Sequence, residues 1–184
     1  PCCTDLNLFK PVKRDSDSFT IGYLGSLGTW YMIKEMLVFF KKIKNKIPNS
    51  KFHFLTKDDS EIIFTYCKEI GINRKYILVG ESDRKDIPFQ TRNWNFSLFF
   101  IKPSYSKLFS SPTKQGELMA MGIPIICNSG VGDVDTIVKK YSSGTIVEID
   151  KKFNVESLLN NVFDEEEIVK GAIDYFSLDK GVKL

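Results

Sequence analysis

The feature of this sequence that most restricts its fold is a regular alternation of strand-like and helix-like segments. Residues 19–24 are suited to a strand, residues 25–29 form a glycine-containing turn, and apolar residues then recur at helical spacing over 30–47. Further strands are predicted over 51–56, 76–79, 96–101, 124–127 and 145–149. Further helices are predicted over 58–70, 86–93, 111–122, 134–141, 155–162 and 165–176.

This alternation predicts an α/β fold with a parallel sheet. Each right-handed crossover between parallel strands needs a helix, so helices cover both faces of the sheet. We therefore expect a Rossmann-like parallel sheet of about six strands with helices on both faces. Ligands of such sheets bind outside the C-terminal ends of the strands, and the glycine turns of this chain follow its strands. A binding site at that edge is predicted.

Length and composition are those of one folded domain. The chain has 184 residues, of which 42% are hydrophobic and 27% are charged, which is enough for a full core. Residues 1–18 are rich in turn-forming residues and show no period, so we interpret them as an interdomain linker and residues 19–184 as the domain. The chain starts at Pro1 with neither a signal peptide nor an initiator methionine, and we expect it to be a piece of a longer protein.

The charge and the apolar runs narrow the choice of partners. A net charge of +3, spread along the chain, does not provide the concentrated basic face that nucleic acid requires. Lys41, Lys42, Lys44 and Lys46 end a predicted helix, where cations favour the dipole, so we interpret them as a solvated face rather than an anionic-membrane patch. No apolar run approaches the roughly 18 to 20 residues that span a bilayer, so no transmembrane segment is expected.

The cysteines and the single histidine offer little for metal binding or nucleophilic catalysis. Cys2, Cys3, Cys67 and Cys127 form neither a C-x-x-C pair nor zinc spacing, which indicates reduced thiols and a cytoplasmic location. His53 stands between two phenylalanines in a predicted strand, where a structural role is expected.

The most informative stretch is SSPTKQGELMAMGIPIICN, over 110–128. Ser111 is suited to cap a helix with Pro112 at its first position, and the free amides of such a tip attract an anion. Lys114 and Glu117 lie on one helix face, about 4.5 Å apart along the axis. A cation at the helix tip with a carboxylate one turn deeper suits a nucleoside diphosphate. The cation would meet the pyrophosphate, and the carboxylate would accept hydrogen bonds from two ribose hydroxyls. The alternative is an ordinary surface ion pair.

Other turns supply further candidates. Gly22, Gly25 and Gly28 do not form the G-x-G-x-x-G fingerprint, and neither that motif nor a P-loop occurs in the sequence, which disfavours a dehydrogenase and a P-loop NTPase. Residues 79–82 end a strand where they could border a base, although a simple strand exit is the alternative. Gly132 could approach a donor sugar, and Asp133 beside it could instead cap the next helix. Asp58 and Glu61 are expected to form a capping box on the second helix.

Three stretches in this order, FTIGYLGSLGTWY, YILVGES and SSPTKQGELMAMGIPIICNSGVGD, resemble the C-terminal, donor-binding half of the retaining GT-B glycosyltransferases called family 4 or group 1. The opening PCCTDLNLFKP is similar to the segment that joins the two halves in that family. The resemblance covers nearly the whole chain. Its most specific part is Pro-Thr-Lys-x-x-Glu followed by small-x-Gly-x-Pro.

The resemblance implies roles for particular residues. Glu117 would hold the ribose hydroxyls, the amides near Thr113 together with the Lys114 ammonium would hold the pyrophosphate, and residues 80–82 would border the base. Lys114 and Glu117 are the catalytic candidates. The donor-binding candidates are Gly25, Ser26, Gly28, Val79, Gly80, Glu81, Ser82, Ser111, Thr113, Lys114, Glu117 and Gly132.

The sequence also departs from the family pattern. The family commonly has two glutamates separated by seven residues, and Phe109 stands where the first would be. The first glycine turn often carries an arginine and a lysine that neutralise the diphosphate, whereas Ser26 and Tyr31 stand in that region here. These differences concern the sugar contacts and the neutralisation of the diphosphate.

The function that the resemblance implies is donor binding in a retaining glycosyltransferase of polysaccharide biosynthesis. Such an enzyme moves a hexose from a UDP- or GDP-linked sugar to an acceptor hydroxyl. No metal is expected, since no Asp-x-Asp pair occurs. The N-terminal acceptor-binding half would be the missing partner, through which any peripheral membrane contact would be made, and the fragment alone is expected to be inactive. The alternatives are a non-catalytic Rossmann-like nucleotide-binding or docking module and half of a sugar-nucleotide epimerase.

Overall fold

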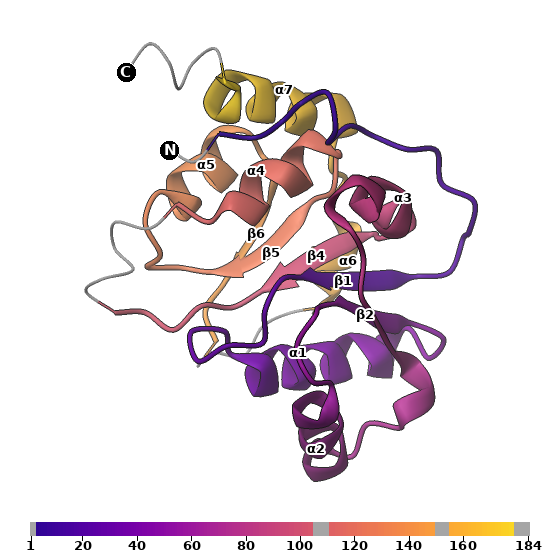
Figure 1. Cartoon of the computed structure of the whole chain (residues 1–184). Helices are drawn as coiled ribbons and strands as arrows, with labels where there is room; N and C mark the ends of the chain where they lie inside the picture. Colours follow the sequence, from indigo (N-terminus) through magenta and orange to yellow (C-terminus); the bar gives the residue numbers. More distant parts are fainter. Residues whose placement is uncertain (1–2, 105–110, 150–154, 179–184) are drawn as a thin grey trace.

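The centre of the protein is a single parallel sheet (Figure 1). The structure is a computed structural model that describes residues 3–104, 111–149 and 155–178. Six strands lie in the order β3-β2-β1-β4-β5-β6, and every neighbouring pair is parallel. The strands are β1 (Thr20–Leu24), β2 (Lys51–Leu55), β3 (Ile77–Gly80), β4 (Phe96–Phe99), β5 (Ile125–Asn128) and β6 (Gly144–Val147). The predicted Rossmann-like sheet is confirmed.

Helices cover both faces of this sheet. Figure 1 shows α1 and α2 on one face and α3, α4, α5 and α7 on the other. The helices are α1 (Ile33–Lys46), α2 (Glu61–Ile70), α3 (Ile87–Thr91), α4 (Thr113–Ala120), α5 (Val134–Lys140), α6 (Val155–Asn160) and α7 (Glu165–Phe176), with short 3₁₀ turns at Arg74–Tyr76 and Arg84–Asp86. None of the helices within the described ranges has the length and hydropathy of a membrane span.

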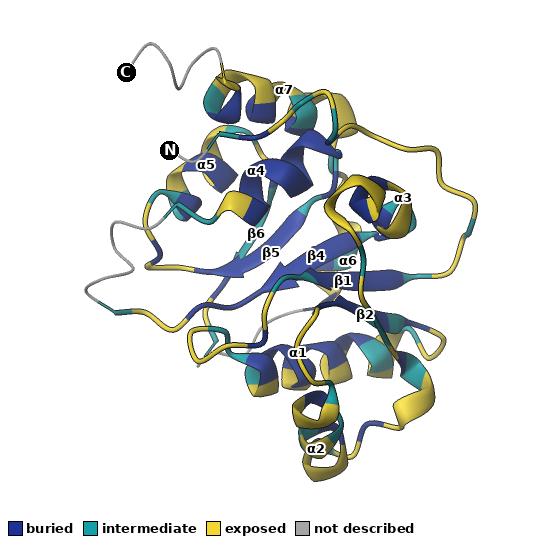
Figure 2. Ribbon diagram, viewed as in Figure 1, coloured by how far each residue is buried: buried dark blue, intermediate teal, exposed yellow. Residues whose placement is uncertain are grey.

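Periodic apolar residues build the core between sheet and helices. The central strands β4 and β5 are buried along their whole length, and α1 buries one side only (Figure 2). The helical spacing found in the sequence is the reason: Ile33, Met36, Leu37, Phe40 and Ile43 face the sheet, while the lysines between and after them lie at the surface or partly covered. Among the cysteines, Cys3, Cys67 and Cys127 are free thiols, and Cys2 lies outside the described residues.

The single histidine has a structural role, as predicted. Trp94 Nε1 donates to His53 Nδ1 over 3.1 Å, and burial lowers the pKa of the imidazole, so it stays neutral as the acceptor. The Trp94 ring itself packs against Gly22 of β1, where an added Cβ would stand 1.8 Å from the ring. Gly22 therefore serves packing in the sheet rather than phosphate binding.

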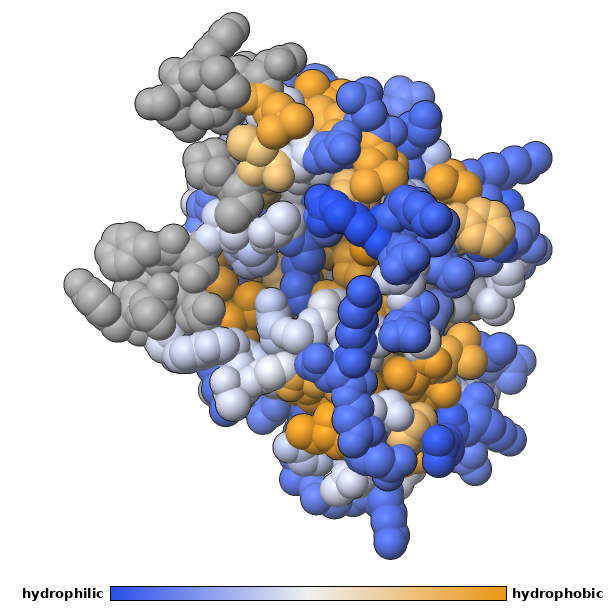
Figure 3. Space-filling model, in the orientation of Figure 1, coloured by the Kyte–Doolittle hydropathy of each residue, from blue (hydrophilic) through white to orange (hydrophobic). Residues whose placement is uncertain are grey.

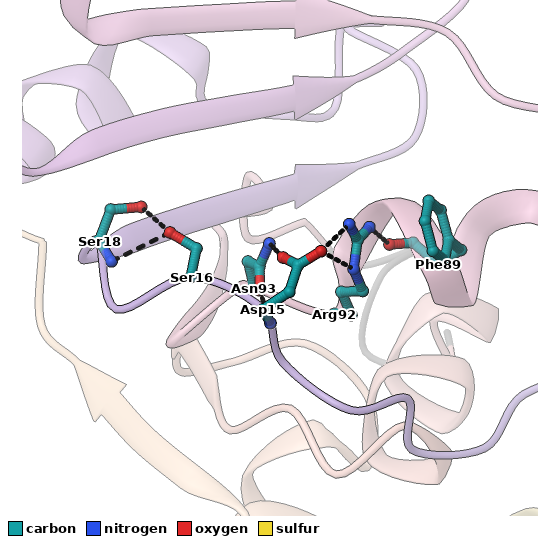
Figure 4. A network of polar contacts seen from close by, with 6 residues as sticks. All are labelled: Asp15, Ser16, Ser18, Phe89, Arg92 and Asn93. Atoms are coloured by element: carbon teal, nitrogen blue, oxygen red, sulfur yellow. Dashed lines mark hydrogen bonds and ion pairs between the residues drawn. The ribbon is translucent and has the colours of Figure 1, made fainter.

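Residues 3–18 lie along the domain instead of standing away from it. Thr4 pairs with Ser177 just after α7, and its amide donates to the carbonyl of Phe176 over 2.8 Å. Phe9 is only 1% exposed. Further on, Asp15 accepts hydrogen bonds from Arg92 and Asn93 (Figure 4). The segment is thus attached beside α7 at Thr4 and just after α3 at Asp15.

Two predicted helix caps are wrong. Ser111 does not cap α4: Pro112 occupies the N-cap position, with φ −65° and ψ 116°, and the hydroxyl of Ser111 has no partner among the described residues. Asp58 does not cap α2 either, and its actual contact belongs to the candidate site.

Candidate donor-binding site

The candidate site lies where the chain order of the sheet reverses, between β1 and β4. The chain passes outward from β1 to β2 and β3 and then returns to place β4 on the other side of β1. In open α/β sheets, the crevice at the C-terminal ends of two such strands is where ligands bind. The helix that follows β4 is α4, and it carries Lys114 and Glu117.

Lys114 reaches back from the start of α4 over this crevice. Its ammonium lies 4.5 Å from the ring centre of Tyr23 in β1, 3.8 Å from that of Tyr31 and 5.8 Å from that of Phe99 in β4. Aromatic faces attract cations, but they do not replace hydrogen bonds. Within the described residues the ammonium has no hydrogen-bond partner, and the residue is 9% exposed. The cation is therefore held in place without an anion beside it.

Burial changes the ionisation of Lys114. It lowers the pKa of the ammonium to about 7, and the nearby Glu117 carboxylate opposes that shift. An anion placed beside the ammonium would stabilise its charged form. The arrangement is therefore suited to binding a negatively charged ligand.

The glycine turn after β1 leaves room for this lysine. Gly25 has φ +128°, which favours glycine, and an added Cβ would stand 2.8 Å from the Lys114 ammonium. The Gly25 amide donates to the carbonyl of Leu55, which holds the turn against β2. The predicted candidates Gly25 and Lys114, far apart in the sequence, therefore meet at one point.

Glu117 lies one turn further along the same buried side of α4. It is 5% exposed, and its Oε1 atom is 2.6 Å from Nη1 of Arg84. This contact is an ion pair: no described residue donates an aligned hydrogen bond to Oε1. Burial raises the pKa of the carboxyl, while the Arg84 guanidinium and the Lys114 ammonium oppose the shift. The carboxylate thus keeps capacity to accept hydrogen bonds.

A cavity of about 320 Å³ opens beside the glycine turn. Its walls come from the ends of β1 and β2 and from the loop after β3. The lining residues are Leu24, Gly25, Ser26, Leu55, Thr56, Lys57, Asp58, Ser82 and Ile87. Three predicted donor-binding residues, Gly25, Ser26 and Ser82, therefore line one cavity.

Asp58 lines this cavity and binds the glycine turn instead of capping a helix. Its Oδ2 atom accepts a hydrogen bond of 2.5 Å from the amide of Leu27, in the glycine turn. The start of α2 is held by Asp59, whose Oδ1 accepts from the amide of Glu61 over 3.0 Å. The capping box predicted for Asp58 and Glu61 is therefore wrong, because the Asp58 carboxylate instead joins the loop after β2 to the turn after β1.

The structure places the other predicted residues around the cavity but not in its wall. Val79 and Gly80 belong to β3, where they pair with β2, and Glu81 is exposed beyond them. Gly28 and Thr113 are exposed on the rims formed by the glycine turn and α4. Gly132 is exposed after β5, and its neighbour Asp133 accepts a hydrogen bond from Tyr175 over 2.7 Å rather than capping α5. Phe109 lies outside the described residues.

Sequence reasoning missed Arg84 and the aromatic surroundings of Lys114. Arg84 stands in the loop after β3, at the same edge as the predicted residues 80–82, and that position was the available signal. Tyr31 was noted only as a replacement for a lysine. In the structure its ring is the closest of the three rings to the Lys114 ammonium. Lys114 of α4 therefore places a cation beside Tyr31, in the region where the family often has a lysine.

Comparison with solved structures identifies the fold. Sucrose-phosphate synthase from Thermosynechococcus elongatus superposes with a TM-score of 0.74 at 15% identity, covering 98% of this chain and 48% of that one. The C-terminal domain of a glycosyl transferase group 1 family protein, LpcC from Francisella tularensis, gives 0.71 at 15% identity, covering 95% and 99%. TarM from S. aureus, solved with UDP, gives 0.71 at 12% identity, covering 96% and 36%.

The chain thus spans about half of the synthase structure and nearly all of the isolated LpcC domain. No curated protein sequence matches it. The family model described as glycosyl transferases group 1 matches residues 5–174, from the segment before β1 into the last turn of α7. On this match, and on a fold shared with GT-B glycosyltransferases, the chain belongs to the glycosyl transferases group 1 family.

Proposed function

We propose that this chain is the nucleotide-sugar-binding half of a retaining hexosyltransferase that uses a UDP- or GDP-linked donor. The observation that carries the proposal is the buried Lys114 ammonium without a hydrogen-bond partner among the described residues, one helical turn from Glu117 at the reversal point of the sheet. A nucleoside diphosphate supplies what both groups lack. Its diphosphate pairs with Lys114, and its ribose hydroxyls donate to Glu117.

These contacts assign a chemical task to each group. When the glycosidic bond to the diphosphate breaks, negative charge develops on the leaving phosphate oxygen. Lys114, the amides at the tip of α4 and the positive end of its dipole stabilise that charge, while Glu117 fixes the ribose and thereby the position of the diphosphate. In this proposal these groups, rather than a metal ion, stabilise the leaving diphosphate.

The cavity beside the glycine turn is the proposed place for the base. Ser26, Ser82 and the backbone of Gly25 line it at the side of the crevice away from α5. The acceptor site and the rest of the catalytic surroundings belong to another half, because this chain matches only part of the sucrose-phosphate synthase and TarM structures. TarM was solved with UDP, which supports a nucleotide donor here. We expect the isolated chain to bind donor and to turn over little.

Substitution Glu117→Gln tests the proposal. The amide keeps the shape of the side chain but loses the charge that strengthens hydrogen bonds from ribose hydroxyls. We expect affinity for UDP or GDP, measured by calorimetry, to fall about tenfold or more with an unchanged fold. Glu167→Gln, an exposed carboxylate of α7, is the matched control and should bind like wild type. A wild-type chain that binds neither nucleotide at millimolar concentration contradicts the proposal and favours a docking module.

A further inference from the structure

Arg84 covers the carboxylate of Glu117 from the solvent side. It begins the 3₁₀ turn after β3, and its side chain crosses to α4, where Nη1 lies 2.6 Å from Glu117 Oε1. The side chain of Arg84 is 57% exposed and that of Glu117 only 7%. The guanidinium also lies over the ring of Phe9, with Cζ 4.8 Å from the ring centre.

This position is the one that a ribose would need. A hydroxyl that donates to Oε1 must approach within hydrogen-bond distance, and Nη1 already occupies that space. Only one partner of this ion pair faces solvent, since the side chain of Arg84 is 57% exposed and that of Glu117 only 7%, and Oε1 receives no aligned hydrogen bond from a described residue. The guanidinium can therefore leave Glu117 when ribose hydroxyls replace it at the buried carboxylate and the ligand offers the arginine another anion.

The nucleotide itself offers that anion. Its diphosphate brings at least two negative charges to the crevice, and Lys114, once an anion lies beside it, supplies one positive charge. At least one negative charge of the diphosphate is therefore left without a counter-charge. Arginine stays protonated and binds phosphate oxygens through two parallel N–H groups. The loop that carries Arg84 also contributes Ser82 to the cavity wall, so the side chain is anchored between the base cavity and Glu117.

We propose that Arg84 is a donor-binding residue with two positions: on Glu117 when the site is empty, and on the diphosphate when a nucleotide is bound. This inference rests on the proposed function, since it assumes that Glu117 takes the ribose. It predicts opposite effects on two ligands that differ only in phosphate. For a nucleoside, Arg84 is only a competitor at Glu117. For a nucleoside diphosphate, it is a competitor at Glu117 and also a ligand of the phosphates.

Arg84→Met separates these effects in the 184-residue chain. Methionine keeps an apolar stem against Phe9 but removes the charge and the donors. We expect uridine or guanosine to bind at least threefold more tightly than to wild type, because the competitor is gone, and UDP or GDP to bind about tenfold more weakly. Affinities are measured by calorimetry for the diphosphates and by ligand-observed NMR for the nucleosides. Arg84→Lys should recover part of the diphosphate affinity.

The matched control is Arg74→Met. Arg74 lies in the 3₁₀ turn before β3, over the ring of Phe64, at the opposite end of the same strand, and its loss should change neither affinity. If Arg84→Met weakens both ligands, strengthens both or changes neither, the two-position inference is overturned. If wild type binds neither ligand, the proposed function fails instead, whereas loss of UDP or GDP binding in Glu117→Gln with no split in Arg84→Met overturns the inference on Arg84 alone.

Discussion

Lys114 is the residue whose environment differs most from that of an ordinary surface lysine. Three aromatic rings surround its ammonium, and none of them accepts its protons as a carboxylate would. Desolvation is the larger influence on its pKa, and the attraction of Glu117 is the smaller. Burial of the Lys114 charge therefore destabilises the folded chain, and this destabilisation is measurable as a pH dependence of stability.

We expect the free energy of unfolding to rise with pH above neutrality through Lys114. Its pKa is about 7 in the folded chain and 10.5 as a model lysine. Between these values the unfolded chain binds a proton that the folded chain does not, so stability increases with pH by up to about 1.4 kcal/mol per unit. Urea unfolding of wild type and Lys114→Met from pH 7 to 9 measures this increase in stability. The variant should be the more stable at pH 7, and its advantage should shrink as pH rises.

Gly25 is predicted to be irreplaceable although it contributes no side chain. Its φ of +128° strains any other residue by about 1–3 kcal/mol. A Cβ there would also press on the Lys114 ammonium from 2.8 Å. Gly25→Ala should lower the midpoint of thermal unfolding and weaken UDP or GDP binding. Gly28→Ala is the comparison, because its Cβ would meet only Ser26 Oγ at 3.8 Å, an ordinary contact, and its melting temperature should stay close to that of wild type.

The relative positions of individual residues could be predicted from the sequence where both residues lie in one helix or strand. The placement of Lys114 and Glu117 on one side of α4 follows from their spacing of three residues. The contact between Arg84 and Glu117 could not be predicted, since it joins the 3₁₀ turn after β3 to helix α4. The distance between these two elements depends on how the whole sheet is packed. For the same reason Asp58 was mistaken for a helix cap: the Leu27 amide, which donates to the Asp58 carboxylate, comes within its reach only once β1 and β2 are paired.

The helix α4 depends on a glycine that local propensity would disfavour. An added Cβ on Gly116 would stand 2.4 Å from Thr4 Oγ1 and 2.7 Å from the ring of Phe176 in α7. The missing side chain allows the first residues of the chain and the last helix to approach α4 closely. Helix α4 is thereby fixed from the side opposite to Lys114's crevice.

We expect Gly116→Ala to destabilise the fold. In an exposed helix, alanine would be more favourable than glycine by about 1 kcal/mol. Here the overlap with Thr4 and Phe176 reverses the sign, and we predict a loss of about 1–3 kcal/mol, as for overpacking in a core. Chemical unfolding of the variant measures this loss. A variant that is more stable than wild type would show that α7 and the N-terminal segment pack less closely on α4 than described.

The order and type of the elements could be predicted because their apolar periods are clear. The strands are short buried runs, and α1, α2 and α7 show one apolar face each. The ends of the elements were less predictable. Helix α4 begins at Thr113 with Pro112 as its N-cap, one residue later than predicted, because the backbone of Pro112 is extended, with ψ 116°.

For the whole molecule, strand order determines where chemistry can take place. The sheet reverses its direction of growth between β1 and β4, and the glycine turn, Lys114 and the cavity gather at that edge. Figure 3, in the orientation of Figure 1, shows apolar and polar residues side by side on this face of the molecule. The fold could be predicted as a class from the alternation of elements, whereas the closing of the crevice by Arg84 depends on the assembled sheet.

The N-terminal segment contacts the helix that carries Glu117 and the arginine that pairs with it. Thr4 packs on Gly116, between Lys114 and Glu117 in the sequence, and Phe9 lies beneath the Arg84 guanidinium. A displacement of this segment would shift the helix and the arginine together. Tension applied at Thr4 would accordingly reach the proposed nucleotide contacts without passing through the sheet.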